Sequence, residues 1–172
     1  TCTVDANERN ATRKNHSATH LLHFALRRVL GDHVKQRGSL VGPHRLRFDF
    51  SHFSPMTADE IYAIESLVNE RILANAPAQT DVLAKEEAVK RGAIAFFGDK
   101  YGEEVRMLTI TDDSVELCGG THVNATGDIG LFKIVTDSSI AAGVRRVEAV
   151  TGMDALKWVQ EQESTIVGLA AG

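Results

Sequence analysis

Two short motifs place metal-ligating side chains at spacings that suit a single ion. In residues 15–20 (NHSATH), His16 and His20 are four positions apart, so on a helix their imidazoles project from one face. In residues 118–122 (CGGTH), Cys118 and His122 flank glycines that let a loop turn both side chains toward one metal. Three nitrogens and one thiolate suit zinc, which is tetrahedral and borderline soft. We therefore predict one Zn²⁺ per chain, held by these four side chains.

Each motif alone also has a simpler explanation. Two histidines at this spacing can form a polar helix face, and a cysteine near a histidine can be a buried thiol. His23 lies one turn further along, and we expect it to be a polar residue on an exposed edge. A zinc peptidase is poorly supported, because Ser17 stands where the HExxH motif has glutamate. Cys118 could instead act as a covalent nucleophile with His122 as its base.

A long first helix must position the histidine pair. The pattern predicts it over residues 12–30, with Gly31 as its end. One apolar stripe runs along it, made of Ala18, Leu22, Ala25 and Val29. The histidines fall on nearly the opposite side, so we expect them to face away from the core.

The remaining elements alternate irregularly between helix and strand. A second helix is expected to begin at Thr57, which has capping-box spacing to Glu60, and to end before Pro77. Two more helices are expected, a short one over residues 86–91 and a last one from residue 152. Strands are predicted over residues 34–41, 46–50, 105–110, 114–117, 131–135 and 143–150. This order predicts an α+β domain, with a mixed sheet and flanking helices.

Charge is distributed unevenly along the chain. The net charge is −4, which argues against a wholly basic nucleic-acid binder. Residues 1–53, however, carry nine Lys/Arg against four Asp/Glu, and a basic segment of this kind can face a polyanion. We find no apolar run long enough for a membrane span and no signal peptide, so we expect a cytoplasmic protein that does not bind membranes.

Six motifs together resemble the editing domain of the alanyl-tRNA synthetases. They are residues 15–23 (NHSATHLLH), 36–41 (QRGSLV), 46–53 (LRFDFSHF), 97–101 (FGDKY), 116–123 (ELCGGTHV) and 130–152. The paired HxxxH and CxxxH motifs are shared with the threonyl-tRNA synthetases, whereas CGGTH and RFDFSH favour the alanyl family. The resemblance implies that His16, His20, Cys118 and His122 are the zinc ligands. It also implies an editing domain over residues 1–152 and the start of a C-terminal helical segment over residues 153–172.

The task of that domain is to hydrolyse the ester of serine or glycine wrongly attached to tRNA(Ala). A synthetic site cannot easily reject a smaller side chain or one with an added hydroxyl, so a second site removes the product. The resemblance makes Thr19 and Gln36 pocket residues, together with Cys118. From the residues alone, the better interpretations are that the Thr19 hydroxyl bonds to a carbonyl of its own helix and that Gln36 is an ordinary surface residue. Candidates for tRNA phosphate contact are Arg13, Lys14, Arg45, Arg47, Arg145 and Arg146.

Three questions stay open at this level. We favour a piece of a longer alanine-tRNA ligase over a freestanding trans-editing relative, because the chain lacks an initiator Met. The rest of the synthetase would then be a partner beside the charged tRNA(Ala) acceptor end. A non-catalytic, zinc-stabilised tRNA-binding module is the alternative from another class. Four protein ligands also describe a closed structural site, whereas a catalytic zinc normally keeps one position open.

Overall fold

The computed structural model describes residues 2–95 and 102–170 of the 172-residue chain. The FGDKY motif, residues 97–101, lies outside the described residues. In chain order the elements are α1 (Ala6–Leu30), β1 (Gln36–Val41), β2 (Leu46–Ser51), α2 (Ala58–Leu73), β3 (Gln79–Ala84), α3 (Lys85–Lys90), β4 (Glu104–Thr111), β5 (Ser114–Leu117), the 3-10 helix η2 (Thr126–Ile129), β6 (Phe132–Ala141), β7 (Val144–Thr151) and α4 (Gly152–Ala170). The α+β class expected from the sequence is confirmed.

The strands form two separate sheets, and this corrects the expectation of one mixed sheet. One sheet has the order β1-β2-β7-β6 and the other β3-β4-β5, and every strand pair is antiparallel. Short turns join β1 to β2, β4 to β5 and β6 to β7, and such connections allow only antiparallel neighbours. In addition, an isolated parallel bridge joins Ile94 to Glu116 of β5.

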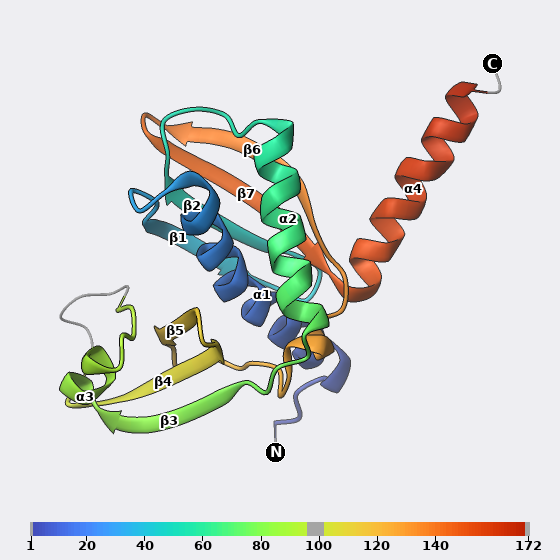
Figure 1. Ribbon diagram of the computed structural model, residues 1–172. Coiled ribbons are helices and arrows are strands. Elements are labelled where there is room, and N and C mark those ends of the chain that lie inside the picture. The colour runs from blue at the N-terminus through green and yellow to red at the C-terminus, as the bar shows by residue number, and fades with distance from the viewer. Residues whose placement is uncertain (1, 96–101, 171–172) are drawn as a thin grey trace.

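Helix α1 contacts both sheets, so the middle of the helix is covered on two sides (Figure 1). Three members of the predicted apolar stripe, Ala18, Leu22 and Ala25, are fully buried in the main core, and the fourth, Val29, is half-buried against it. His20 and His23 are buried as well, because β4 and β5 cover that side of the helix. The expected exposed position of His23 is therefore wrong: it is 3% exposed.

Two apolar clusters hold the molecule together. The larger one lies among α1, α2 and the four-stranded sheet, where it includes Phe48, Phe50 and Phe132, and it also takes in Leu108 and Ile110 of β4. The smaller one belongs to β3–β5 and α3 and includes Met107 and Leu117. The three-stranded sheet therefore has a modest core of its own beside the main body.

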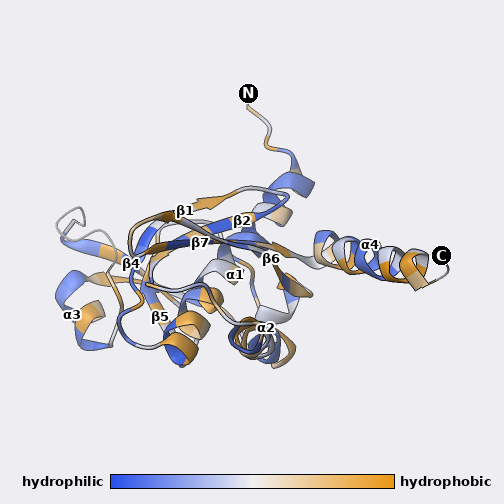
Figure 2. Cartoon of the chain, turned by 90° about the horizontal axis from the view of Figure 1, so that it is seen from above, coloured by the Kyte–Doolittle hydropathy of each residue, from blue (hydrophilic) through white to orange (hydrophobic). Residues whose placement is uncertain are grey.

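The last helix leaves the body of the molecule. Figure 1 shows α4 projecting away from the sheets, and Figure 2 shows apolar and polar residues interspersed along it. Only Ala155 of this helix is buried. Among the described residues, no helix is both long enough and apolar enough to cross a membrane.

Candidate metal centre

The two predicted motifs meet in space. His16 and His20 come from the middle of α1, and Cys118 and His122 come from the loop that follows β5. The ligand-type atoms of all four side chains lie within 4.8 Å of one another. Cys118 Sγ is 3.5 Å from His16 Nε2, and His20 Nε2 is 3.1 Å from His122 Nε2.

This donor set fits a tetrahedral zinc ion. Zinc–nitrogen bonds of about 2.0–2.1 Å and zinc–sulfur bonds of about 2.3 Å place neighbouring ligand atoms roughly 3.3–3.6 Å apart. Two imidazole nitrogens at 3.1 Å need a proton or a cation between them, because both otherwise present lone pairs. The four side chains can therefore hold one metal, as a structural zinc site does.

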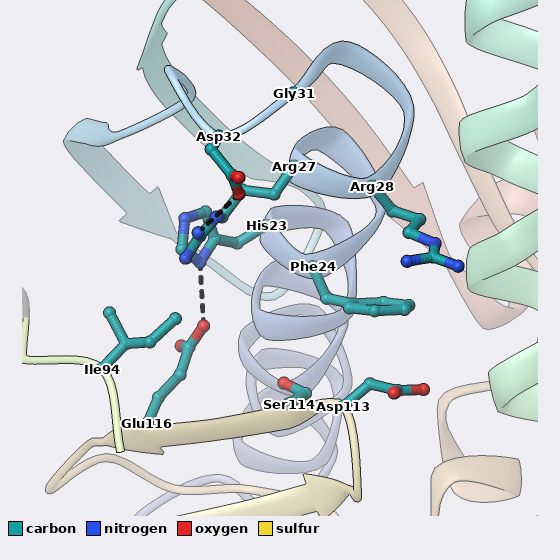
Figure 3. A pocket seen from close by; sticks show the side chains of 10 residues that line it. All are labelled: His23, Phe24, Arg27, Arg28, Gly31, Asp32, Ile94, Asp113, Ser114 and Glu116. Atoms are coloured by element: carbon teal, nitrogen blue, oxygen red, sulfur yellow. Dashed lines mark hydrogen bonds and ion pairs between the residues drawn. The ribbon is translucent and has the colours of Figure 1, made fainter. Parts of the chain in front are cut away.

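Glu116 contacts two histidines of α1, and its role is not among the predictions made from the sequence. Its carboxylate is 3% exposed; one oxygen contacts His20 Nδ1 and the other lies 2.9 Å from His23 Nδ1. Figure 3 shows the contact between His23 and Glu116 at the wall of a cavity. A carboxylate that accepts the Nδ1 proton leaves Nε2 of His20 free as a ligand. The signal in the sequence was a glutamate at an inward position of a short strand, two residues before Cys118.

The electrostatics of the cluster favour a thiolate and one charged imidazole when no metal is bound. Burial alone would raise the pKa of Cys118, but hydrogen bonds from His122, His16 and His20 lower it to about 3. Burial alone would lower the pKa of His20, but Glu116 and Cys118 raise it to about 9. The pKa of Glu116 falls to about 2 against the effect of burial, chiefly because His20 lies beside it. A metal would replace the proton on His20.

The glycine loop is fitted closely to α1. A Cβ atom on Gly120 would lie 2.1 Å from His16 Cε1, whereas one on Gly119 would meet nothing within 4 Å. Arg106 donates to the carbonyl oxygens of both glycines, at 3.2 and 2.7 Å. At the end of the loop, the Val123 N–H donates to the buried hydroxyl of Ser17, 3.0 Å away. Ser17 lies between His16 and His20 in the sequence of α1.

The two predicted pocket residues lie outside the four-ligand cluster. Thr19 is buried, and its hydroxyl donates to the Asn15 carbonyl at 2.8 Å, within its own helix. Gln36 begins β1 and lines a cavity of about 340 Å³ together with His23. A neighbouring cavity of about 490 Å³ is lined by His23 and Glu116 among others (Figure 3). The roles of Thr19 and Gln36 in recognising a substrate stay predictions.

Most of the arginines proposed for tRNA contact have carboxylate partners. Arg146 makes two hydrogen bonds to Asp49, at 2.7 and 2.8 Å, and these hold the pKa of that carboxyl below its usual value. The other ion pairs are Arg145–Asp137 at 2.7 Å, Arg45–Glu148 at 3.4 Å and Arg47–Asp49 at 3.8 Å. Arg13 and Lys14 lie half-buried on α1. A phosphate contact by any of the six stays a prediction.

Known proteins resemble this chain over nearly all its length. Residues 105–148 match the family described as the threonyl and alanyl tRNA synthetase second additional domain. The alanine–tRNA ligase of Nitratidesulfovibrio vulgaris is 59% identical over 98% of the chain, and that of Bordetella avium 61% over 95%. The alanine–tRNA ligase of Halorhodospira halophila is 56% identical over 99% of the chain.

The chain spans about a fifth of the length of these relatives: 19% of the first two and 20% of the third. The matched domain covers β5, the CGGTH loop and one half of the metal centre. The expected family is thereby confirmed: the chain belongs to the alanine–tRNA ligases, of which it corresponds to the segment that contains the second additional domain.

Proposed function

We propose that the chain is an editing domain that hydrolyses seryl and glycyl esters of tRNA(Ala) at a zinc-containing site. The observation that carries the proposal is the cluster of His16, His20, Cys118 and His122; Glu116, which contacts His20, also lines the cavity of about 490 Å³. The relatives are ligases, and a ligase that selects alanine needs a second site to remove serine and glycine. The rest of the synthetase chain and the charged acceptor end are the proposed partners, in the cytoplasm.

The proposed chemistry is the cleavage of an activated ester. When bound, zinc would polarise a carbonyl or lower the pKa of a water. Glu116 keeps His20 in the tautomer that leaves Nε2 available, and Arg106 holds the loop backbone in place. We assign the recognition of the serine hydroxyl to Thr19 and Gln36, since a hydroxyl and an amide can each donate and accept. The backbone amides of Gly119, Gly120 and Thr121 are candidates for stabilising the oxyanion.

The test is deacylation by the purified chain. Seryl-, glycyl- and alanyl-charged tRNA(Ala) are incubated with it, and the loss of each ester is followed together with the zinc content. Faster loss of the seryl and glycyl esters is expected. Thr19→Val and Gln36→Ala should leave the fold intact and change the ratio of seryl to alanyl rates, because one hydrogen bond to substrate is worth about 1 kcal/mol.

A second candidate is a non-catalytic, zinc-stabilised module that binds tRNA. The four protein ligands favour it, because a closed tetrahedral shell is typical of structural zinc sites. This candidate predicts tRNA binding and zinc retention without ester hydrolysis. If none of the three esters is lost faster with the zinc-loaded chain than without it, the editing proposal is wrong and the second candidate takes its place.

A further inference from the structure

A ladder of aromatic rings leads from the core to the surface at the end of β2. Phe48 and Phe50 are fully buried, and the ring of His52 stacks on Phe50 with 6.2 Å between centroids. The ring of His33 meets that of His52 edge to edge, with 5.1 Å between centroids, and the centroid of Phe53 lies 6.4 Å from that of His33. The interplanar angles of these three contacts are 26°, 22° and 25°, so the rings are nearly parallel. Phe53 ends the ladder, and it is 86% exposed.

The outer rings are held in place although His33 and Phe53 are exposed. Nε2 of His33 lies 2.8 Å from Nδ1 of His52, so one imidazole donates and the other accepts. The backbone N–H of His52 donates to the Gly143 carbonyl in the β6–β7 turn. Gly143 has φ +69°, and a Cβ there would lie 3.3 Å from Phe53 Cε1, so the ring rests against this turn. A pre-ordered ring binds a flat partner at a smaller cost in conformational entropy than a mobile one.

Basic side chains flank the ladder on one side. The Lys35 carbonyl accepts a hydrogen bond from Ser51 N–H, which extends the pairing of β1 and β2 toward His33. Lys35 and Arg37 are both exposed; Lys35 lies between the turn that contains His33 and the start of β1, and Arg37 lies where the register of β1 shifts between Gln36 and Gly38. Arg37 Nε donates to the Ser51 hydroxyl, and because a hydroxyl is neutral this contact does not neutralise the charge of Arg37. The acidic neighbour Asp32 is paired with Arg27 at 2.9 Å (Figure 3).

The same basic pair lines one of the two cavities described above. Lys35, Gln36 and Arg37 line the cavity of about 340 Å³, whose other wall includes His23, the contact of Glu116. An RNA end bound by Lys35 and Arg37 would therefore lie beside this cavity. Proteins that bind single-stranded RNA combine exposed aromatic rings, on which bases stack, with basic side chains along the backbone.

We propose that His33, His52 and Phe53 form a stacking platform for an unpaired nucleotide of RNA, with Lys35 and Arg37 placed for its phosphates. The inference deepens the proposed function, since the RNA would be the single-stranded end of the tRNA. It assigns RNA contact to side chains that were not among those predicted from the sequence. Two of the predicted ones, Arg145 and Arg146, form ion pairs with Asp137 and Asp49.

The test measures binding of a fluorescent single-stranded RNA that ends in CCA to the purified chain, by anisotropy, over a range of salt concentrations. Phe53→Ala should weaken binding roughly 5- to 100-fold, the usual effect of losing one stacked base. Lys35→Ala and Arg37→Ala should each lower the slope of log affinity against log salt by about one unit. Tyr62→Ala is the matched control, because Tyr62 is 74% exposed on α2, and it should bind as the unaltered chain does.

The proposal is overturned if the unaltered chain does not bind this RNA at low salt, if Phe53→Ala binds equally well, or if Tyr62→Ala weakens binding as much. Self-association that is abolished by Phe53→Ala without a change in RNA binding would assign the platform to a second copy of the chain instead. Deacylation of seryl-tRNA by the same preparations keeps the two proposals apart. Hydrolysis without an effect of Phe53 refutes only the platform, and Phe53-dependent binding without hydrolysis refutes only the editing activity.

Discussion

Gly120→Ala is expected to separate zinc binding from folding. The added methyl carbon would lie 2.1 Å from His16 Cε1 and 2.6 Å from Nδ1, so the imidazole must retreat by at least about 1 Å to reach an ordinary contact. Metal–ligand distances tolerate only about 0.2 Å. The structure gives Gly120 no positive φ, so alanine suits its backbone, and without metal the His16 side chain can turn aside. We therefore expect zinc affinity to fall at least about tenfold while the metal-free stability changes by less than about 1 kcal/mol.

The matched control for this substitution is its neighbour. Gly119→Ala places a methyl group where nothing lies within 4 Å, again without a positive φ, and it should bind zinc within about twofold of the unaltered chain. Zinc affinity is measured by competition with a chromophoric chelator, and stability by thermal unfolding in excess chelator. If Gly120→Ala holds zinc as tightly as the unaltered chain, or if Gly119→Ala loses it equally, His16 is not a ligand in this geometry.

Three further predictions concern the same centre. Glu116→Gln should weaken zinc binding about 10- to 100-fold, because an amide cannot accept hydrogen bonds from both imidazoles. The control is Glu65→Gln, which alters another buried carboxylate, paired with Lys133 at 2.6 Å, and should leave zinc binding unchanged. Equal zinc loss in both variants would indicate a general destabilisation. Zinc binding near pH 7.5 should release about one proton, from His20, because the pKa of His20 is about 9 whereas that of Cys118 is about 3. Zinc affinity should therefore rise with pH up to about 9. Calorimetry in buffers of different ionisation enthalpy counts the released protons. A count of zero would mean that His20 is neutral before zinc arrives. Cys118→Ser and Cys118→Ala should both lose zinc and the deacylation of seryl-tRNA, whereas a trapped aminoacyl thioester, together with normal zinc content in the variants, would make Cys118 a nucleophile.

The cluster of four candidate ligands could be predicted from the sequence because its signal is local. Histidines four apart on a helix, and a cysteine and histidine around glycines, need no knowledge of the rest of the fold. The contact between His23 and Glu116 could not be predicted because it depends on long-range packing: the two residues lie 93 positions apart and meet only when β5 covers α1. The assumption of one apolar face treated α1 as a surface helix, whereas it is buried on two sides.

The missed elements are polar ones. Strand β3 was not predicted, because its residues are mostly exposed at the edge of the small sheet and carry little alternation of hydrophobicity. The first turns of α1 were missed for a related reason: residues 6–10 are exposed, and the helix begins at residue 6, where the Asp5 side chain caps its free N–H groups. Two sheets instead of one could not be read from strand positions, since strand partners are chosen by tertiary contacts.

The placement of the ligands on α1 and on the loop after β5 has a topological consequence. His16 and Cys118 are 102 positions apart, and they belong to the main body and to the smaller three-stranded unit. An ion bound by both would be a reversible cross-link that closes a loop of about 100 residues. By the chain-entropy estimate for a covalent link of that size, this restricts the unfolded chain by roughly 4–5 kcal/mol. The small unit already packs on the main body through Leu108 and Ile110 of β4, and the metal would add a link that a chelator can remove, so its local opening should depend on the supply of metal.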